Sequence, residues 1–180
     1  MVESLVVDHA PAVGVLRRNA HPGFETEPVD INGTITGWTV GGTGRVAERT
    51  AEGSTIGSGA AVFSAGGDSQ NDTLSQSFTT TIGQSYTLDF DAGIFGAPAN
   101  GANLQLRVQV FGTNSLVDAT NSLPVNTGPS PGDPTKVPFA HYHYVFTANS
   151  DTTTLEFTDV GSGNTNADQV VDSVAVTPAP

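Results

Sequence analysis

The sequence predicts an all-β protein, a two-sheet antiparallel β-sandwich with jelly-roll topology and little or no helix. Several short segments alternate apolar and polar residues, which places one face of a strand in a core and the other in solvent. No longer window keeps the 3.6-residue apolar period of a helix. The 21 glycines and 11 prolines supply turns between many short strands.

The expected strands are short and follow one another along the whole chain. In order they span 3–7, 12–17, 34–40, 44–48, 60–65, 73–80, 85–91, 103–111, 141–147, 153–158 and 170–176. The alternation is clearest at 103–111, where Leu104, Leu106 and Val108 share one face. Two segments, 92–102 and 121–138, lack strand patterning and are predicted as long loops.

A chain of 180 residues is long enough for one domain with a sizeable core. We expect a β-rich N-terminal extension at 1–18, the sandwich at 19–177, and the first residues of a Pro-rich linker at 178–180. The chain has no cysteine, which excludes disulfides and thiolate metal sites.

The formal net charge of −12 excludes two classes of partner. Nucleic acids and anionic membrane surfaces are both bound through basic patches, and six Lys and Arg stand against 18 Asp and Glu. The segment 4–16 is interrupted by polar residues and follows no basic region, so it does not predict a signal peptide. An acidic, Thr- and Gly-rich composition is common in secreted bacterial surface domains, and we expect a secreted or cell-surface protein.

The outward positions of the predicted strands carry the candidate ligand-binding residues. These are Asp89, Gln105, Arg107, Gln109, His141 and His143. If their strands adjoin, they form one polar patch of the kind that takes sugar hydroxyls, while an aromatic ring stacks on the sugar. The alternative is a solvated sheet face. Phe95 lies in the predicted loop at 92–102, where it either stacks on a ligand or caps the edge of the sandwich.

A family resemblance extends over about residues 19–177. It rests on Gly23-Phe24-Glu25, Gly37-Trp38 and the segments 61–63, 74–80, 83–90 and 171–174, in that order. This order resembles the galactose-binding-domain-like jelly rolls, which include bacterial carbohydrate-binding modules. The resemblance implies export, non-catalytic glycan binding and often a structural calcium.

The positions that match the calcium ligands of such domains are Glu25 and Asp172. His21 stands where the family usually has Asn, and Ser173 where it often has a second acid, so this chain offers fewer oxygen ligands. An alternative role for Glu25 is to accept hydrogen bonds from backbone N–H groups at a turn.

The function predicted from the sequence is a non-catalytic carbohydrate-binding module whose partner is a glycan or polysaccharide. The first alternative is a structural or adhesive surface subunit that binds neighbouring copies of itself, and the second is a jelly-roll polysaccharide hydrolase or lyase. No nucleophile elbow, phosphate-binding loop or dinucleotide fingerprint is present. The pair His141 and His143 lacks the Glu and the later His of a cupin metal site, and the oxygen-rich segment 159–168 is typical of an Asx-rich turn.

Overall fold

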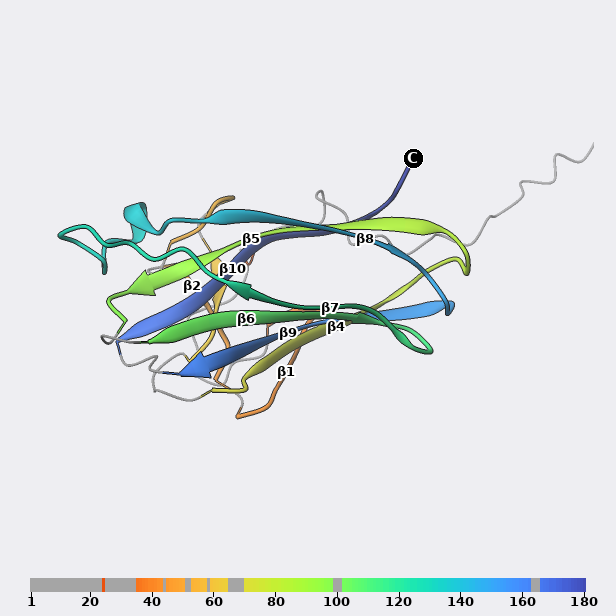
Figure 1. The fold of residues 1–180 in the computed structure, drawn as a ribbon, viewed down its shortest axis with the longest axis horizontal. Helices are drawn as coiled ribbons and strands as arrows, with labels where there is room; N and C mark the ends of the chain where they lie inside the picture. The colour runs from red at the N-terminus through yellow and green to blue at the C-terminus, as the bar shows by residue number, and fades with distance from the viewer. Residues whose placement is uncertain are drawn as a thin grey trace, which may run out of the picture.

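Two antiparallel five-stranded sheets pack face to face, which confirms the predicted all-β sandwich (Figure 1). The computed structural model describes residues 24, 35–43, 45–50, 53–57, 59–64, 70–98, 102–162 and 166–180. Sheet A has the strand order β1-β4-β9-β6-β7, and sheet B has the order β2-β3-β10-β5-β8. The strands are β1 (Thr39–Gly41), β2 (Ala47–Arg49), β3 (Ala60–Val62), β4 (Thr73–Thr79), β5 (Ser85–Gly96), β6 (Asn103–Phe111), β7 (Ser115–Ser122), β8 (Ala140–Thr147), β9 (Thr152–Ser162) and β10 (Ala167–Pro178).

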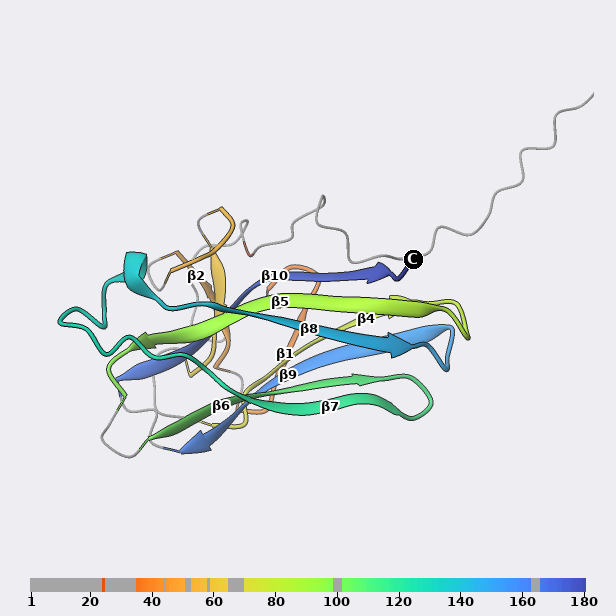
Figure 2. The ribbon, with the colours of Figure 1, turned by 45° about the horizontal axis from the view of Figure 1, so that its top comes forward.

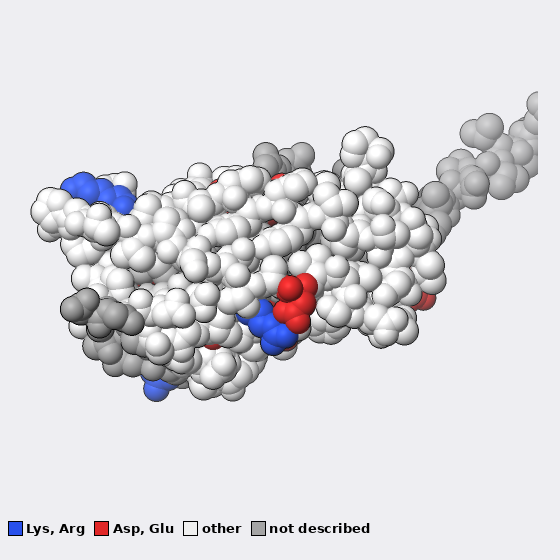
Figure 3. All heavy atoms as spheres, viewed as in Figure 1, with Lys and Arg blue, Asp and Glu red and all other residues white. Residues whose placement is uncertain are grey.

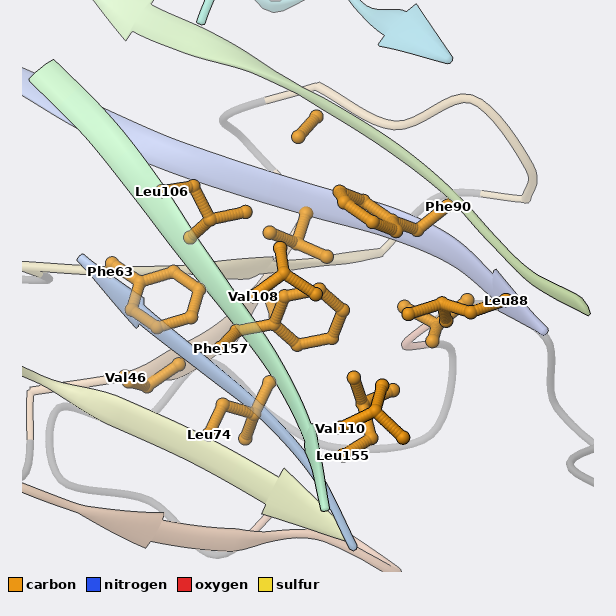
Figure 4. Close-up of a cluster of buried hydrophobic side chains, with 14 of the residues drawn as sticks. Val46, Phe63, Leu74, Leu88, Phe90, Leu106, Val108, Val110, Leu155 and Phe157 are labelled. Carbon is orange, nitrogen blue, oxygen red and sulfur yellow. The ribbon is translucent and has the colours of Figure 1, made fainter. Parts of the chain in front are cut away.

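The core lies between the sheets and is made by the inward residues of the alternating strands (Figure 4). Phe157 on β9 is fully buried, and its ring meets Phe90 on β5 edge-on with the ring centroids 5.0 Å apart. Trp38 is partly buried and packs against this core, with its ring centroid 6.2 Å from that of Phe157. Each such side chain contributes about 1.5–3 kcal/mol when fully buried.

The central strand of each sheet comes from late in the chain. In sheet A, β9 pairs with both β4 and β6. In sheet B, β10 pairs with both β3 and β5, and Figure 2 shows β5 and β10 side by side. The register of β10 against β5 shifts between Asp172 and Ala175, where Ser173 has a φ of 54°. This bulge turns the backbone next to Asp172.

The predicted loop at 92–102 is wrong over its first half. Strand β5 continues through Gly96, and Ile94 pairs with Gln169 of β10. Gly93 lies inside this part of β5, and because glycine is unfavourable within strands, the sequence favoured a loop here. A Cβ there would lie 2.7 Å from the carbonyl oxygen of Pro138, so the close packing of the following loop requires glycine.

Three further boundaries differ from the predicted ones. Strand β7 was not predicted, because its residues are mostly half-exposed and alternate weakly. The long loop that was predicted from 121 therefore begins after Ser122, and a single 3₁₀ turn at Pro134–Lys136 is the only helical element in the described part of the chain. Asp159 lies in strand β9 and not in a turn. The predicted strands 3–7 and 12–17 and the extension 1–18 fall outside the described residues.

No helix in the described ranges is long and apolar enough to cross a membrane. The chain ends beside the start of β5, where the Ala179 N–H donates to the Ser85 carbonyl at 2.8 Å.

Candidate functional site

The outer surface of sheet A is a continuous polar surface that we call the amide face. One register row joins Glu156 on β9, Gln109 on β6 and Asp118 on β7. The next row joins Thr158, Arg107 and Thr120 on the same strands. The remaining members are Thr73, Ser75 and Ser77 on β4, Thr154 on β9, Asn103, Gln105 and Phe111 on β6, and Ser122 on β7. The backbones of neighbouring strands lie about 4.8 Å apart, so side chains in one register row on adjacent strands are neighbours.

A bidentate ion pair holds the centre of the amide face. Arg107 Nε donates to Asp118 Oδ1 at 2.8 Å, and Arg107 Nη2 donates to Asp118 Oδ2 at 2.7 Å. The hydrogen bonds of this pair raise the pKa of Arg107 and lower the pKa of Asp118 from their ordinary values. Both side chains are exposed, so the pair adds little to stability. The pair fixes the orientation of the Arg107 guanidinium plane, and the Asp118 carboxylate balances the Arg107 charge.

The chemistry of the amide face suits hydroxyl-bearing ligands. Amide side chains offer both donors and acceptors, and the Ser and Thr hydroxyls do the same. Gln105 already accepts a bond from Asn103 Nδ2 at 3.2 Å, which shows that adjacent amides here can orient one another. Phe111, half-buried at one end of β6, is the aromatic ring of this face. The face can therefore bind planar, polar, uncharged molecules.

The outer surface of sheet B carries a second polar group, the His–Asp strip of Asp89, Asp91, His141 and His143. His141 Nδ1 lies 2.9 Å from Asp91 Oδ1, and His141 Nε2 lies 3.2 Å from Asp89 Oδ1. His143 Nδ1 lies 2.8 Å from the same Asp89 oxygen. An imidazole can donate from both ring nitrogens only when it is protonated, so this geometry favours the charged form of His141.

We predict that replacing Asp91 by asparagine lowers the pKa of His141 toward its ordinary value of 6.5. The hydrogen bond to Asp91 is the largest cause that raises the pKa of His141, ahead of the contact with Asp89. The pKa is measured from the pH dependence of the His141 ring proton resonances in NMR spectra. The variant Asp151→Asn, which removes an exposed carboxylate elsewhere, should leave it unchanged. An unaltered His141 pKa in Asp91→Asn would contradict the assignment.

The sequence-predicted ligand residues do not form the single patch that adjoining strands would have made. Gln105, Arg107 and Gln109 lie together on the amide face of sheet A. Asp89 and the two histidines of the His–Asp strip lie on the outer surface of sheet B, on the opposite side of the sandwich. A role in ligand binding remains a prediction for both sets.

Phe95 faces the outer side of β5 in sheet B, because its neighbour Ile94 lies in the core between the sheets, and its predicted role as an edge cap stays a prediction. It is half-buried and packs with Phe139 against the small apolar cluster of Ala60, Val62 and Val170. The following loop holds this arrangement, because Pro131 accepts a backbone bond from the residue after Phe95, Gly96, at 3.0 Å. The packing accounts for a large apolar side chain in this position, and a stacking role of Phe95 on a ligand stays a prediction.

Asp172, one of the two predicted calcium ligands, is fully buried and holds the segment 53–57 against β10. Its Oδ2 accepts bonds from Thr55 N at 2.6 Å, Thr55 Oγ1 at 3.0 Å and Ile56 N at 2.9 Å. Its Oδ1 accepts a bond from Ser173 N at 2.6 Å. Burial raises the pKa of Asp172, and these hydrogen bonds oppose the rise. Among the described residues Oδ1 accepts from one donor, Ser173 N, and so has a lone pair left for a cation.

The second predicted ligand, Glu25, lies outside the described residues. Within the described ranges no group of three or more His, Asp or Glu side chains is placed to hold a metal ion. Calcium takes six to eight oxygens, so a site at Asp172 would need carbonyl or hydroxyl oxygens in addition to its carboxylate.

Sequence reasoning missed a pair of buried carboxylates, Asp72 and Asp159, at one end of the core. The alternation itself contained the information, because Leu155, Phe157 and Asp159 share the inward face of β9. The surrounding Gly- and Asn-rich residues favoured a turn instead, so the inward direction of Asp159 was not recognised.

The overall arrangement matches solved carbohydrate-binding modules at low sequence identity. The CBM22-1 xylan-binding domain of Paenibacillus barcinonensis Xyn10C is similar with a TM-score of 0.56 and 15% identity, over 94% of this chain and 97% of that one. A CBM61 module, solved in complex with β-1,4-galactotriose, is similar with a TM-score of 0.55 and 14% identity, over 87% of this chain and 99% of that one. A CBM4 structure is similar with a TM-score of 0.53 and 15% identity, over 79% of this chain and 86% of that one.

Comparisons by sequence give no such match: no protein-family model and no curated protein is similar to the chain. At identities this low, the similarity to solved structures concerns the fold. The chain therefore has the jelly-roll β-sandwich fold of carbohydrate-binding modules, as the resemblance in its sequence predicted.

Proposed function

We propose that this protein is a non-catalytic carbohydrate-binding module that binds a neutral polysaccharide on the amide face. The observation that carries the proposal is the row of planar polar side chains across β9, β6 and β7, with Gln109 at its centre and the fixed Arg107–Asp118 pair beside it. Sugar hydroxyls need donors and acceptors at close spacing, which this row supplies. The shared fold with carbohydrate-binding modules supports the same function.

The charges favour a neutral ligand over an acidic one. Arg107 is already neutralised by Asp118, and Glu156 beside it repels uronate or sulfate groups. The face of the molecule seen in Figure 3 is mostly uncharged, with the few basic atoms in isolated spots. Polysaccharides of this kind are found outside the cytoplasm, and we infer that the protein acts there, on a cell surface or after secretion.

The binding is expected to be weak. Phe111 is the only aromatic side chain on the amide face, and aromatic stacking usually supplies much of the affinity for sugar rings. We therefore expect a dissociation constant nearer about 1 mM than 1 μM for an oligosaccharide, which corresponds to about 4 kcal/mol of binding free energy.

We predict that Gln109→Ala and Arg107→Ala each weaken glycan binding by about 3–10-fold, the value of one hydrogen bond. The measurement is isothermal titration calorimetry with xylan-derived and β-1,4-galactan-derived oligosaccharides, after a screen of neutral polysaccharides. Thr87→Ala, an outward residue of β5 on sheet B, is the matched control and should bind like the wild type. Failure to bind any neutral glycan, or equal loss in the control, would contradict the proposal.

We also propose that a structural calcium is bound by Glu25 and Asp172. Its support comes from the described residues: Asp172 is a buried carboxylate with no cationic partner among them, and its Oδ1 accepts one hydrogen bond from them. A calcium ion would offset the cost of burying this charge. The ion would stabilise the middle of β10 beside its bulge, away from the amide face.

A further inference from the structure

A buried polar cluster, here called the acid latch, lies at the end of the core where the two sheets meet. Its centre is the pair Asp72 and Asp159, and Ser64 joins them; all three are fully buried. Thr43 and Arg45 complete the cluster from the segment between β1 and β2. None of these residues belongs to the amide face or to the His–Asp strip.

The two aspartates contact each other through their backbones and through Ser64. The Asp72 N–H donates to Asp159 Oδ1 at 2.5 Å, and the Asp159 N–H donates to the Asp72 carbonyl at 3.2 Å. Ser64 Oγ donates to Asp159 Oδ2 at 3.0 Å, while the Ser64 N–H donates to Asp72 Oδ2 at 3.3 Å. One serine thus touches both carboxyl groups and keeps them close.

The acid latch connects segments of both sheets. Ser64 follows β3 of sheet B, whereas Asp72 precedes β4 and Asp159 lies on β9, both in sheet A. Asp72 also accepts bonds from the Thr43 hydroxyl and, at 3.0 Å, from the Arg45 N–H. These two residues lie where the chain passes from β1 in sheet A to β2 in sheet B. Breaking the latch would therefore separate the sheets at this end.

The donors to the Asp159 carboxyl group in the described part of the chain are neutral, the Asp72 N–H and the Ser64 hydroxyl. A buried carboxyl group without a cation beside it and with a second acid nearby favours its protonated form. The two positively charged residues of the segment 45–50 are Arg45, which reaches Asp72 with its backbone, and Arg49 on β2.

The other ionisable groups on the packed strands lie near other residues or face outward. Glu48 on β2 lies near Gly59, where its Oε1 is 3.2 Å from the position of an added Cβ. Arg107 on β6 is paired with Asp118 on the outer surface, and Asp168 on β10 lies between inward residues and so faces outward. Gln169, buried on the inner face of β10, is uncharged.

We propose that Asp159 holds a proton in the folded protein, and that protonated Asp159 makes the cluster a pH-sensitive latch between the two sheets. Burial, followed by the charge of Asp72, raises the pKa of Asp159 from 3.8 to about 7. A group whose pKa is raised by folding stabilises the folded state fully at a pH below its unfolded pKa, which is near 4 here. This stabilisation is lost as the pH rises through the folded pKa of about 7. The latch therefore weakens between about pH 4 and 7.

The test is thermal unfolding of the full chain at pH 5 and pH 8, in the presence of a chelator. We expect the wild-type midpoint to be lower at pH 8 by about 5 °C or more, since one kcal/mol shifts the midpoint of a chain this size by about 2–4 °C. The amide side chain of Asp159→Asn does not titrate, so the unfolding midpoint of this variant should change much less between pH 5 and pH 8. Asp151→Asn, an exposed control, should keep the wild-type pH dependence.

Two results would overturn the proposal. One is an equal fall of the midpoint in Asp159→Asn and the wild type. The other is a calcium-induced rise of the wild-type midpoint at pH 8 that Asp159→Asn abolishes, because a cation would then replace the proton. If Asp159→Asn does not fold, infrared spectra of Asp172→Asn, which lacks the other buried carboxyl group of raised pKa, decide: a buried protonated carboxyl band at pH 6 that disappears by pH 8 supports a proton on Asp159, and its absence at pH 6 contradicts it.

Discussion

Replacing Phe157 by alanine is expected to lower the free energy of unfolding by about 3–5 kcal/mol, the largest effect of any single substitution considered for this chain. Phe157 is fully buried on the central strand of sheet A. Its ring contacts Phe90 of the opposite sheet and Trp38 of the segment before β1. Alanine would leave a cavity between the sheets, which the β-sheet backbones are too rigid to close.

The effect of Phe157→Ala is measured by urea unfolding followed through Trp38 fluorescence. Val145→Ala is the matched control, because Val145 is 59% exposed on β8, and its substitution should change stability by less than about 0.5 kcal/mol. A loss below about 1 kcal/mol in Phe157→Ala would mean that the two sheets do not pack around this ring.

Replacing Asp172 by alanine is expected to cost about 2–4 kcal/mol, because three backbone N–H groups and one hydroxyl lose the acceptor that they share. Thr55, Ile56 and Ser173 all donate backbone N–H groups to this carboxylate. The substitution should free the segment 53–57 from β10 and relax the bulge at Ser173. Asp172→Asn keeps one acceptor oxygen, so it should lose less stability than Asp172→Ala.

The stability of the Asp172 variants is measured by thermal unfolding with calcium and with a chelator. If the proposed calcium site is present, calcium raises the wild-type midpoint, and this gain disappears in Asp172→Asn. Asp151→Asn serves as the control and should respond to calcium like the wild type. A wild-type midpoint that ignores calcium, combined with a strong loss in Asp172→Ala, would assign Asp172 a purely hydrogen-bonding role.

Alternation in the sequence was enough to predict much of the fold. The strand predicted at 103–111 agrees with β6, because Leu104 and Val110 lie inward while Gln105 and Gln109 lie outward. Strand β7 was missed for the opposite reason. It is an edge strand whose inward positions include Ala119 and Asn121, which provide little apolar contrast.

The candidate site was only partly predictable, because alternation assigns an outward direction without assigning a sheet. Arg107 and Asp89 both face outward, yet β6 lies in sheet A and β5 in sheet B. The crossing of the chain from one sheet to the other depends on long-range pairing with β9 and β10. The ion pair between Arg107 and Asp118 depended on β7, which was not predicted.

The measurement that tests the central proposal most directly is NMR chemical-shift mapping of the wild-type chain with a neutral oligosaccharide. We expect the shifted amide resonances to cluster on β6, β7 and β9 around Gln109, Arg107 and Glu156, and the His–Asp strip of sheet B to stay unperturbed. Shifts confined to the His–Asp strip, or no shifts at millimolar concentrations of any neutral oligosaccharide tested, would contradict the assignment of glycan binding to the amide face.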